Sequence, residues 1–262
     1  MKITKAILLT ILLMVIWYIP QLTLVGLYKY TSLIGEGFKE HIYAVVILGS
    51  IISYLIIFYF YWTPDLKNVF RLKKMDFRLF PYLILIVLGL GFVNQPFYDF
   101  EKIVDYYQNS NIKPYTGRFH GIDSFFIYFR ISSLLFAPVF EELFFRKFLF
   151  EKLLERNKVL VSIIISSLCF STIHFETPSS LISTFIFGVI ACLIYLRTKN
   201  IWYTIAMHFL NNLFSTLYLI YEESFFGWVY GLNYGFIYWA LFAFGILMMV
   251  LGMKKITTAN TA

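Results

Sequence analysis

The stretch FAPVFEELFFRKFLF, Phe136–Phe150, places two adjacent acids and an arginine inside an apolar, aromatic run. A carboxylate at bilayer depth costs about 2.5–3.5 kcal/mol on insertion scales, so such groups usually face the protein interior and have a task there. In a helix, Glu142 and Arg146 share one face and can pair. Glu141 is rotated by about 100° and points elsewhere. Both acids could serve helix packing alone, but an acid left outside the pair favours a functional role.

The composition around this stretch is typical of a membrane protein. Hydrophobic residues make up 60% of the 262 residues and charged residues only 14%, against about 25% in soluble domains. The net charge of +7 does not indicate nucleic-acid binding, because the basic residues lie in short segments between apolar runs. Cys169 and Cys192 both lie inside apolar runs, and we expect them to be small buried hydrophobes.

Apolar runs recur along the chain at the length of a membrane-spanning helix, which is about 20 residues. The candidate spans are Ile7–Tyr28, Ile42–Trp62, Leu79–Phe97, Ser124–Phe150, Val159–Phe175, Ser179–Leu196, Ile201–Ile220 and Phe236–Met253. The first run has no Ala-x-Ala cleavage site, so we expect an uncleaved span. The sequence therefore predicts an all-α, polytopic membrane protein with about eight transmembrane helices, organised as a single integral membrane domain over residues 1–262.

The basic residues also predict the orientation of these spans. If the eight spans alternate, one side holds five basic residues: Lys29, Lys39, Lys102, Lys113 and Arg118. Arg130 lies inside the fourth span, and the other 16 of the 22 basic residues lie on the opposite side. Because Lys and Arg favour the cytoplasm, both termini are predicted to be cytoplasmic in a bacterial cell membrane. The longest outer loop, Tyr98–Gly121, could be a lid or a connector, and we favour a connector.

Three further polar residues stand where apolar ones would be expected. His174 ends the fifth run, and His208 and Asn212 share one helical face of the seventh, from which Asn211 is turned away. A single histidine in such a place is usually a hydrogen-bonded packing residue. However, counting about 1.5 Å per residue puts Glu141 and these three side chains about 10–22 Å from the inner end of their spans. We therefore expect one buried site among the fourth, fifth and seventh helices.

The chemistry of such a site would suit peptide hydrolysis. A carboxylate and a neutral imidazole can take a proton from water and return it to a leaving amine. A second imidazole and an amide can donate hydrogen bonds to the oxyanion of a tetrahedral intermediate. Glu141, His174 and His208 could equally hold a catalytic zinc ion, because three such ligands leave a position for water. Residue types alone do not decide between these mechanisms.

Three motifs in this order resemble those of the CPBP intramembrane proteases, which include the type II CAAX prenyl endopeptidases and the bacteriocin-linked Abi proteins. The motifs are Glu141-Glu142-x-x-x-Arg146, Phe170-x-x-x-His174 and His208-x-x-x-Asn212. The resemblance covers a catalytic half at about residues 124–220. The spans within residues 7–97 and the last span, at about 236–253, carry no motif.

The resemblance implies a role for each motif residue. Glu141 and His174 would activate the attacking water, and His208 and Asn212 would form the oxyanion site. Glu142, Arg146 and Phe170 would support them. Members of the family are described both as metalloproteases and as glutamate-dependent proteases, so the favoured mechanism requires no cofactor and zinc is the alternative.

The sequence therefore predicts an intramembrane endopeptidase that acts on a membrane-associated peptide or protein within the lipid bilayer, without nucleic acid. The alternative is a non-catalytic bacteriocin-immunity or interaction protein on the same scaffold. A proton-coupled carrier ranks third, because the chain shows no inverted repeat or paired broken helices. The substrate and the oligomeric state are left open.

Overall fold

A computed structural model describes residues 1–30, 42–62, 75–110, 119, 121–175 and 177–259. These residues form helices and turns, with no β-strand among them. Together with six described helices that are long and apolar enough to cross a membrane, this confirms the prediction of an all-α, polytopic membrane protein.

Each predicted span contains helix in the structure. The elements are α1 (Ile3–Tyr30), α2 (Ile42–Ile57) with the π-helical η2 (Phe58–Trp62), the 3₁₀ turn η3 (Phe77–Leu79) leading into α4 (Phe80–Tyr98), α9 (Val159–Thr172), the 3₁₀ turn η6 (Pro178–Ser180), α10 (Leu181–Thr198), α11 (Ile201–Ile220) and α13 (Phe236–Ala259). The fourth span alternates between α and π geometry through α6 (Ser124–Ile131), η4 (Ser132–Phe136), α7 (Ala137–Glu142), η5 (Leu143–Phe150) and α8 (Glu151–Leu154).

Six helical segments of the described chain are long and apolar enough to cross a membrane. They are residues 3–24, 44–62, 77–98, 124–154, 181–198 and 236–259. The helix α9 is apolar but has only 14 residues, and α11 is not among the six. The expected helices are thus all present, and the crossing of the membrane by α9 and α11 stays a prediction.

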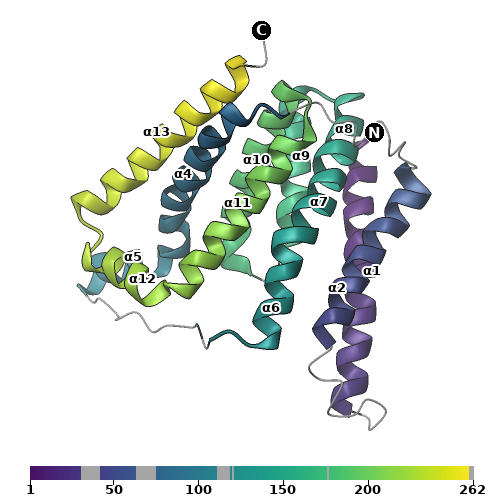
Figure 1. Cartoon of the computed structure of the whole chain (residues 1–262), viewed down its shortest axis with the longest axis horizontal. Helices are drawn as coiled ribbons and strands as arrows, with labels where there is room; N and C mark the ends of the chain where they lie inside the picture. Colours follow the sequence, from purple (N-terminus) through teal and green to yellow (C-terminus); the bar gives the residue numbers. More distant parts are fainter. Residues whose placement is uncertain (31–41, 63–74, 111–118, 120, 176, 260–262) are drawn as a thin grey trace. The chain divides into compact units, whose positions relative to one another are not determined.

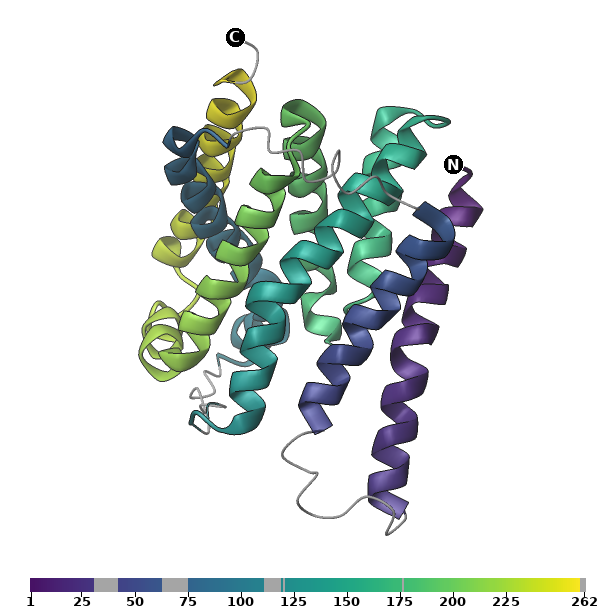
Figure 2. The same ribbon diagram turned by 45° about the vertical axis from the view of Figure 1, so that its right-hand side comes forward.

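The helices group into two compact units. The first, residues 1–74 and 122–173, contains α1, α2 and α6 to α9. Within it α1 packs along α2 (Figure 2) and also against α9. The ring of Tyr54 on α2 stacks on Phe140 of α7 at 5.8 Å. These contacts bury the stretch that carries the two acids.

The second unit, residues 75–121 and 174–262, contains α4, α5 and α10 to α13. Here α13 lies along α4 (Figure 1), and glycines let the two backbones approach closely. A Cβ on Gly89 would lie 2.6 Å from the carbonyl oxygen of Gly245. The helices α10 and α11 pack on each other and on α4. The division into two compact units does not test the prediction of a single integral membrane domain, which stays a prediction.

In the described part of the chain, two short helices lie between the predicted spans. The helix α5 (Phe100–Asn109) occupies part of the segment expected to be a connector, and α12 (Glu222–Gly231) precedes α13. Apolar and aromatic side chains join them in a cluster of Val229, Tyr230, Tyr234 and Tyr238, against which Ile103 and Tyr106 pack. A rule that seeks runs of about 20 apolar residues does not find helices of this length.

A buried carboxylate holds this end of the second unit together. Asp99 is 1% exposed. It accepts hydrogen bonds from the hydroxyls of Tyr230 at 3.0 Å and Tyr238 at 3.1 Å, and from Gln95 Nε2 at 2.7 Å. These bonds satisfy the acid and link α4 to α12 and α13, so its role is structural.

Candidate active site

The first motif lies where α7 meets the π-helical stretch η5, in the first unit. The composite helix starts at Asp123, whose Oδ1 accepts a hydrogen bond from Phe126 N at 2.7 Å and so caps it. Single π-helical turns inside α-helices often occur at functional sites. The motif is therefore placed on a helix whose geometry departs from a regular α-helix on both sides of α7.

The two acids have different surroundings, as the sequence predicts. Arg146 Nε lies 3.2 Å from Glu142 Oε2, and both side chains are fully buried. The expected i,i+4 ion pair is therefore confirmed. Glu141 is 7% exposed and lies beside this pair in the sequence. A buried ion pair is costly to break from one side, so we expect Glu142 and Arg146 to stabilise the motif helix.

Phe170 connects the second motif to the first. The Arg146 guanidinium lies over its ring, 4.2 Å from the centroid. Phe145 meets the same ring edge-on at 5.3 Å. One turn before Phe170, the Ser166 hydroxyl donates a hydrogen bond to the Phe145 carbonyl at 2.9 Å. The helix α9 is thus fixed to the motif helix by a cation–π contact, a ring contact and a hydrogen bond.

The predicted span Val159–Phe175 implied that His174 is helical. In the structure His174 instead lies in a turn beyond α9. The helix ends at Thr172. The His174 carbonyl accepts hydrogen bonds from the Thr177 backbone N–H at 3.0 Å and from its hydroxyl at 3.2 Å. Such local bonds compete with helix continuation, and Pro178 disfavours helical geometry in the residue before it. The histidine is half-buried.

The third motif lies on α11, in the second unit. Asn200 caps this helix by accepting a hydrogen bond from Trp202 N at 3.1 Å. His208 is 4% exposed, and its ring lies 5.0 Å from that of Phe187 on α10. Asn212 follows one turn later and is half-buried. Because α11 is a regular α-helix, His208 and Asn212 share one face, as expected.

The candidate residues are distributed over both units. Glu141, Glu142, Arg146 and Phe170 belong to the first unit, and His174, His208 and Asn212 belong to the second. The structure brings residues together within each unit, namely Phe170 with the first motif and His208 with Asn212 on one helix. The meeting of all of them in one site belongs to the proposal below.

Neither unit by itself, in the part of the chain that the structure describes, groups three His, Cys, Asp or Glu side chains that could hold a metal ion. The proposed zinc ligands Glu141, His174 and His208 come from both units. Their donor set fits zinc, so zinc stays an alternative.

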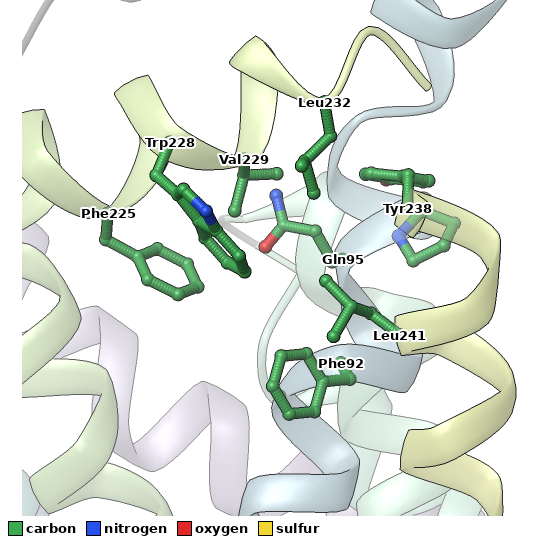
Figure 3. Close-up of a pocket in the computed structure, with 10 residues that line it drawn as sticks. Phe92, Gln95, Phe225, Trp228, Val229, Leu232, Tyr238 and Leu241 are labelled. Atoms are coloured by element: carbon green, nitrogen blue, oxygen red, sulfur yellow. The ribbon is translucent and has the colours of Figure 1, made fainter. Parts of the chain in front are cut away.

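A small pocket in the second unit lies apart from these residues. Figure 3 shows Gln95 at its centre, with Phe92, Phe225 and Trp228 among the apolar side chains around it. It is formed by α4, α12 and α13, and none of the predicted site residues lines it. The pocket was not expected from the sequence, because the helix α12 was not.

One residue near the two acids belongs to none of the three motifs. Tyr54 on α2 is 5% exposed, and it contacts both Phe140 and Phe144 of the motif helix, at 5.8 and 6.1 Å between ring centroids. The sequence signal that could have identified Tyr54 is a polar hydroxyl within the second apolar run.

Known proteins resemble the part of the chain that carries the motifs. Residues 123–214 match the family described as type II CAAX prenyl endopeptidase Rce1-like. This segment, about a third of the chain, is similar to that family. The resemblance to the CPBP proteases is thereby confirmed for residues that include all three motifs.

A curated relative and the solved structures add two further findings. The chain is 34% identical over 84 residues to the Bacillus subtilis protein named "Putative membrane peptidase YdiL". That alignment covers 32% of this chain and 34% of the relative, so the chain spans about a third of the length of the relative it matches. No solved structure matches the chain.

Proposed function

We propose that this chain is an intramembrane endopeptidase that hydrolyses peptide bonds of a membrane-associated peptide or protein. The observation that carries the proposal is the Rce1-like match of residues 123–214, which contain Glu141, His174, His208 and Asn212 in order. The name of the Bacillus subtilis relative, a membrane peptidase, supports the same reaction class.

In the proposed mechanism Glu141 and His174 activate water. The carboxylate takes a proton from the water as it attacks the scissile carbonyl, and it later gives that proton to the leaving amine. His208 and Asn212 donate hydrogen bonds to the oxyanion of the tetrahedral intermediate. The burial of Glu141 and His208, at 7% and 4% exposed, supports this assignment, because hydrogen bonds and charges act more strongly away from water.

Zinc is the alternative in the same site. If Glu141, His174 and His208 held the ion, it would polarise the carbonyl and lower the pKa of a bound water. The favoured mechanism needs no metal, because the oxyanion donors and the general base are side chains. Turnover that survives 1,10-phenanthroline and metal-free buffer would support it, and loss of turnover restored by zinc would contradict it.

The experiment that tests the proposed function compares variants of the purified, detergent-solubilised protein. The substrates are an internally quenched peptide with a farnesylated CAAX end and its unprenylated counterpart. Glu141→Gln should lower kcat by about 10²–10⁴-fold, the usual effect of losing a general base. Asn212→Ala should lower kcat, whereas its neighbour Asn211→Ala, the matched control turned away from the shared face, should not. Full turnover by Glu141→Gln would overturn the assignment of Glu141 as the general base. No cleavage of either peptide by the folded wild type would favour the non-catalytic alternative.

A further inference from the structure

The hydroxyl of Tyr54 is a buried hydrogen-bond donor beside the candidate base, and it has no hydrogen-bond partner among the described residues. The side chain is 5% exposed. Leaving a buried polar group without a partner costs about 1–3 kcal/mol, so native proteins rarely keep one without a reason. If Tyr54 served only for packing, a phenylalanine would serve equally well at this position.

Ring contacts place Tyr54 against the first motif. Its ring is close to parallel with that of Phe140, the residue directly before Glu141, with centroids 5.8 Å apart and planes at 23°. It meets Phe144, one turn later on the same face, edge-on at 6.1 Å. At about 100° per residue, Glu141 points to a direction only about 60° from Phe144, so the carboxylate lies beside the face that Tyr54 covers.

Electrostatics identify the same neighbourhood. The carboxylates of Glu141 and Glu142 and the guanidinium of Arg146 all lie close enough to act on the Tyr54 phenol. Tyr18 on α1 also acts on it. Glu142 is already paired with Arg146. Glu141 and the phenol are thus a proposed base and a neutral donor within one unit.

The chemistry of hydrolysis supplies a ligand for such a donor. When water adds to the scissile carbonyl, its oxygen becomes an oxyanion that needs neutral, fixed donors nearby. A phenol keeps its proton at neutral pH and can donate it without transferring it. We propose that Tyr54 is a further oxyanion donor, whose hydroxyl hydrogen-bonds the tetrahedral intermediate formed at Glu141.

This inference rests on the proposed function and adds a residue outside the Rce1-like segment, since Tyr54 precedes residues 123–214. It makes Tyr54 a catalytic residue that acts in the transition state. The loss of its hydroxyl should therefore reduce kcat more than it raises KM.

The test is the Tyr54→Phe variant of the full-length protein, assayed with the quenched farnesylated peptide. We expect kcat to fall by about 10²-fold, the effect of removing one oxyanion donor. KM should stay within about twofold, and the melting temperature in detergent should not fall, because the hydroxyl has no partner to lose. The affinity for a peptide phosphonate that mimics the tetrahedral intermediate should fall with kcat.

Two matched Tyr→Phe controls separate this role from packing. Tyr59, exposed in the following η2 turn, should change neither kcat nor melting temperature when replaced. Tyr98 donates or accepts a hydrogen bond with Ser183 at 2.8 Å. Tyr98→Phe should therefore lower the melting temperature and leave kcat unchanged.

A fluorinated tyrosine incorporated at position 54 supplies a readout that packing would not move. Its more acidic phenol is a stronger hydrogen-bond donor, so kcat should change while the melting temperature stays that of the wild type. If the wild type cleaves the peptide and Tyr54→Phe has the same kcat, the inference is overturned and the proposed function stands. A loss of kcat that follows a lower melting temperature would overturn it too. Failure of the wild type to cleave either peptide would overturn both.

Discussion

The guanidinium of Arg146 lies between two partners, with its Nε 3.2 Å from Glu142 Oε2 and its plane 4.2 Å from the ring centroid of Phe170. One side chain therefore joins Glu142 of the first motif to the helix that leads into the second motif. All three residues are at most 2% exposed. Because dielectric screening is weak there, the arrangement fixes the motif helix against α9.

We expect Glu142→Gln to act on stability first. It leaves the Arg146 charge buried without its acid, and breaking a buried pair from one side typically costs about 3–5 kcal/mol. Arg146→Gln should reproduce the loss, and the double variant should recover part of it. Unfolding in an SDS titration would measure all three. Equal stability of Glu142→Gln and the wild type would contradict a structural role for the pair.

A double-mutant cycle should detect the contact between Arg146 and Phe170. Arg146→Gln combined with Phe170→Leu should give a coupling energy of about 2 kcal/mol, the size of a desolvated cation–π contact. Phe148, on the same stretch η5, contacts Trp62 and Phe144. The cycle of Arg146→Gln with Phe148→Leu is therefore the control, and its coupling should be near zero. Equal coupling in both cycles would show that the effect is not specific to the stack.

Local spacing explains which parts of the site were predictable. The Glu142–Arg146 pair follows from one helical turn, and the His208–Asn212 face follows in the same way. The stack of Arg146 on Phe170 could not be foreseen, because it depends on how α9 packs against the motif helix. Motif spacing likewise indicates nothing about Tyr54, which reaches the motif from α2.

The fold was predictable where apolar length decides it. Every predicted span contains a helix, but α5 and α12 are too short for that rule. Arg130 shows the same limit at the level of one side chain. Its position inside the fourth span does not predict a partner, and its guanidinium lies 5.1 Å from the ring centroids of Phe126 and Phe129.

Two glycine substitutions should have opposite effects on stability. In Gly245→Ala the new Cβ would lie 2.8 Å from the Gly89 carbonyl oxygen, so α13 and α4 must separate. Such overpacking costs about 1–3 kcal/mol. Gly227 in α12 has open space around it, and Gly227→Ala should gain about 0.5–1 kcal/mol from helix propensity. Melting temperatures in detergent measure both. A stable Gly245→Ala variant would contradict the close approach of the two helices.

The orientation of the chain is expected to follow its basic residues. Reporter fusions after Lys199, between α10 and α11, and after Lys254, near the end of α13, should both give a cytoplasmic signal. A fusion after Lys102, in α5, should give the opposite signal. An external signal from Lys254 would contradict the predicted topology and place the cluster around Asp99 on the other side.

High pH should loosen the cluster of α5, α12 and α13 through Tyr234. Burial, with a smaller contribution from the nearby Asp99 carboxylate, raises the pKa of Tyr234 above its usual value of about 10. The folded state then holds this proton more tightly than the unfolded state does. The resulting stability is fully present below about pH 10 and is lost as the pH rises further. Between about pH 9.5 and 11, the melting temperature of Tyr234→Phe should therefore fall less than that of the wild type. The exposed Tyr59, replaced by phenylalanine, serves as the control and should keep the wild-type slope. If Tyr234→Phe also kept the wild-type slope, the pH dependence of the melting temperature would not arise from the Tyr234 phenol.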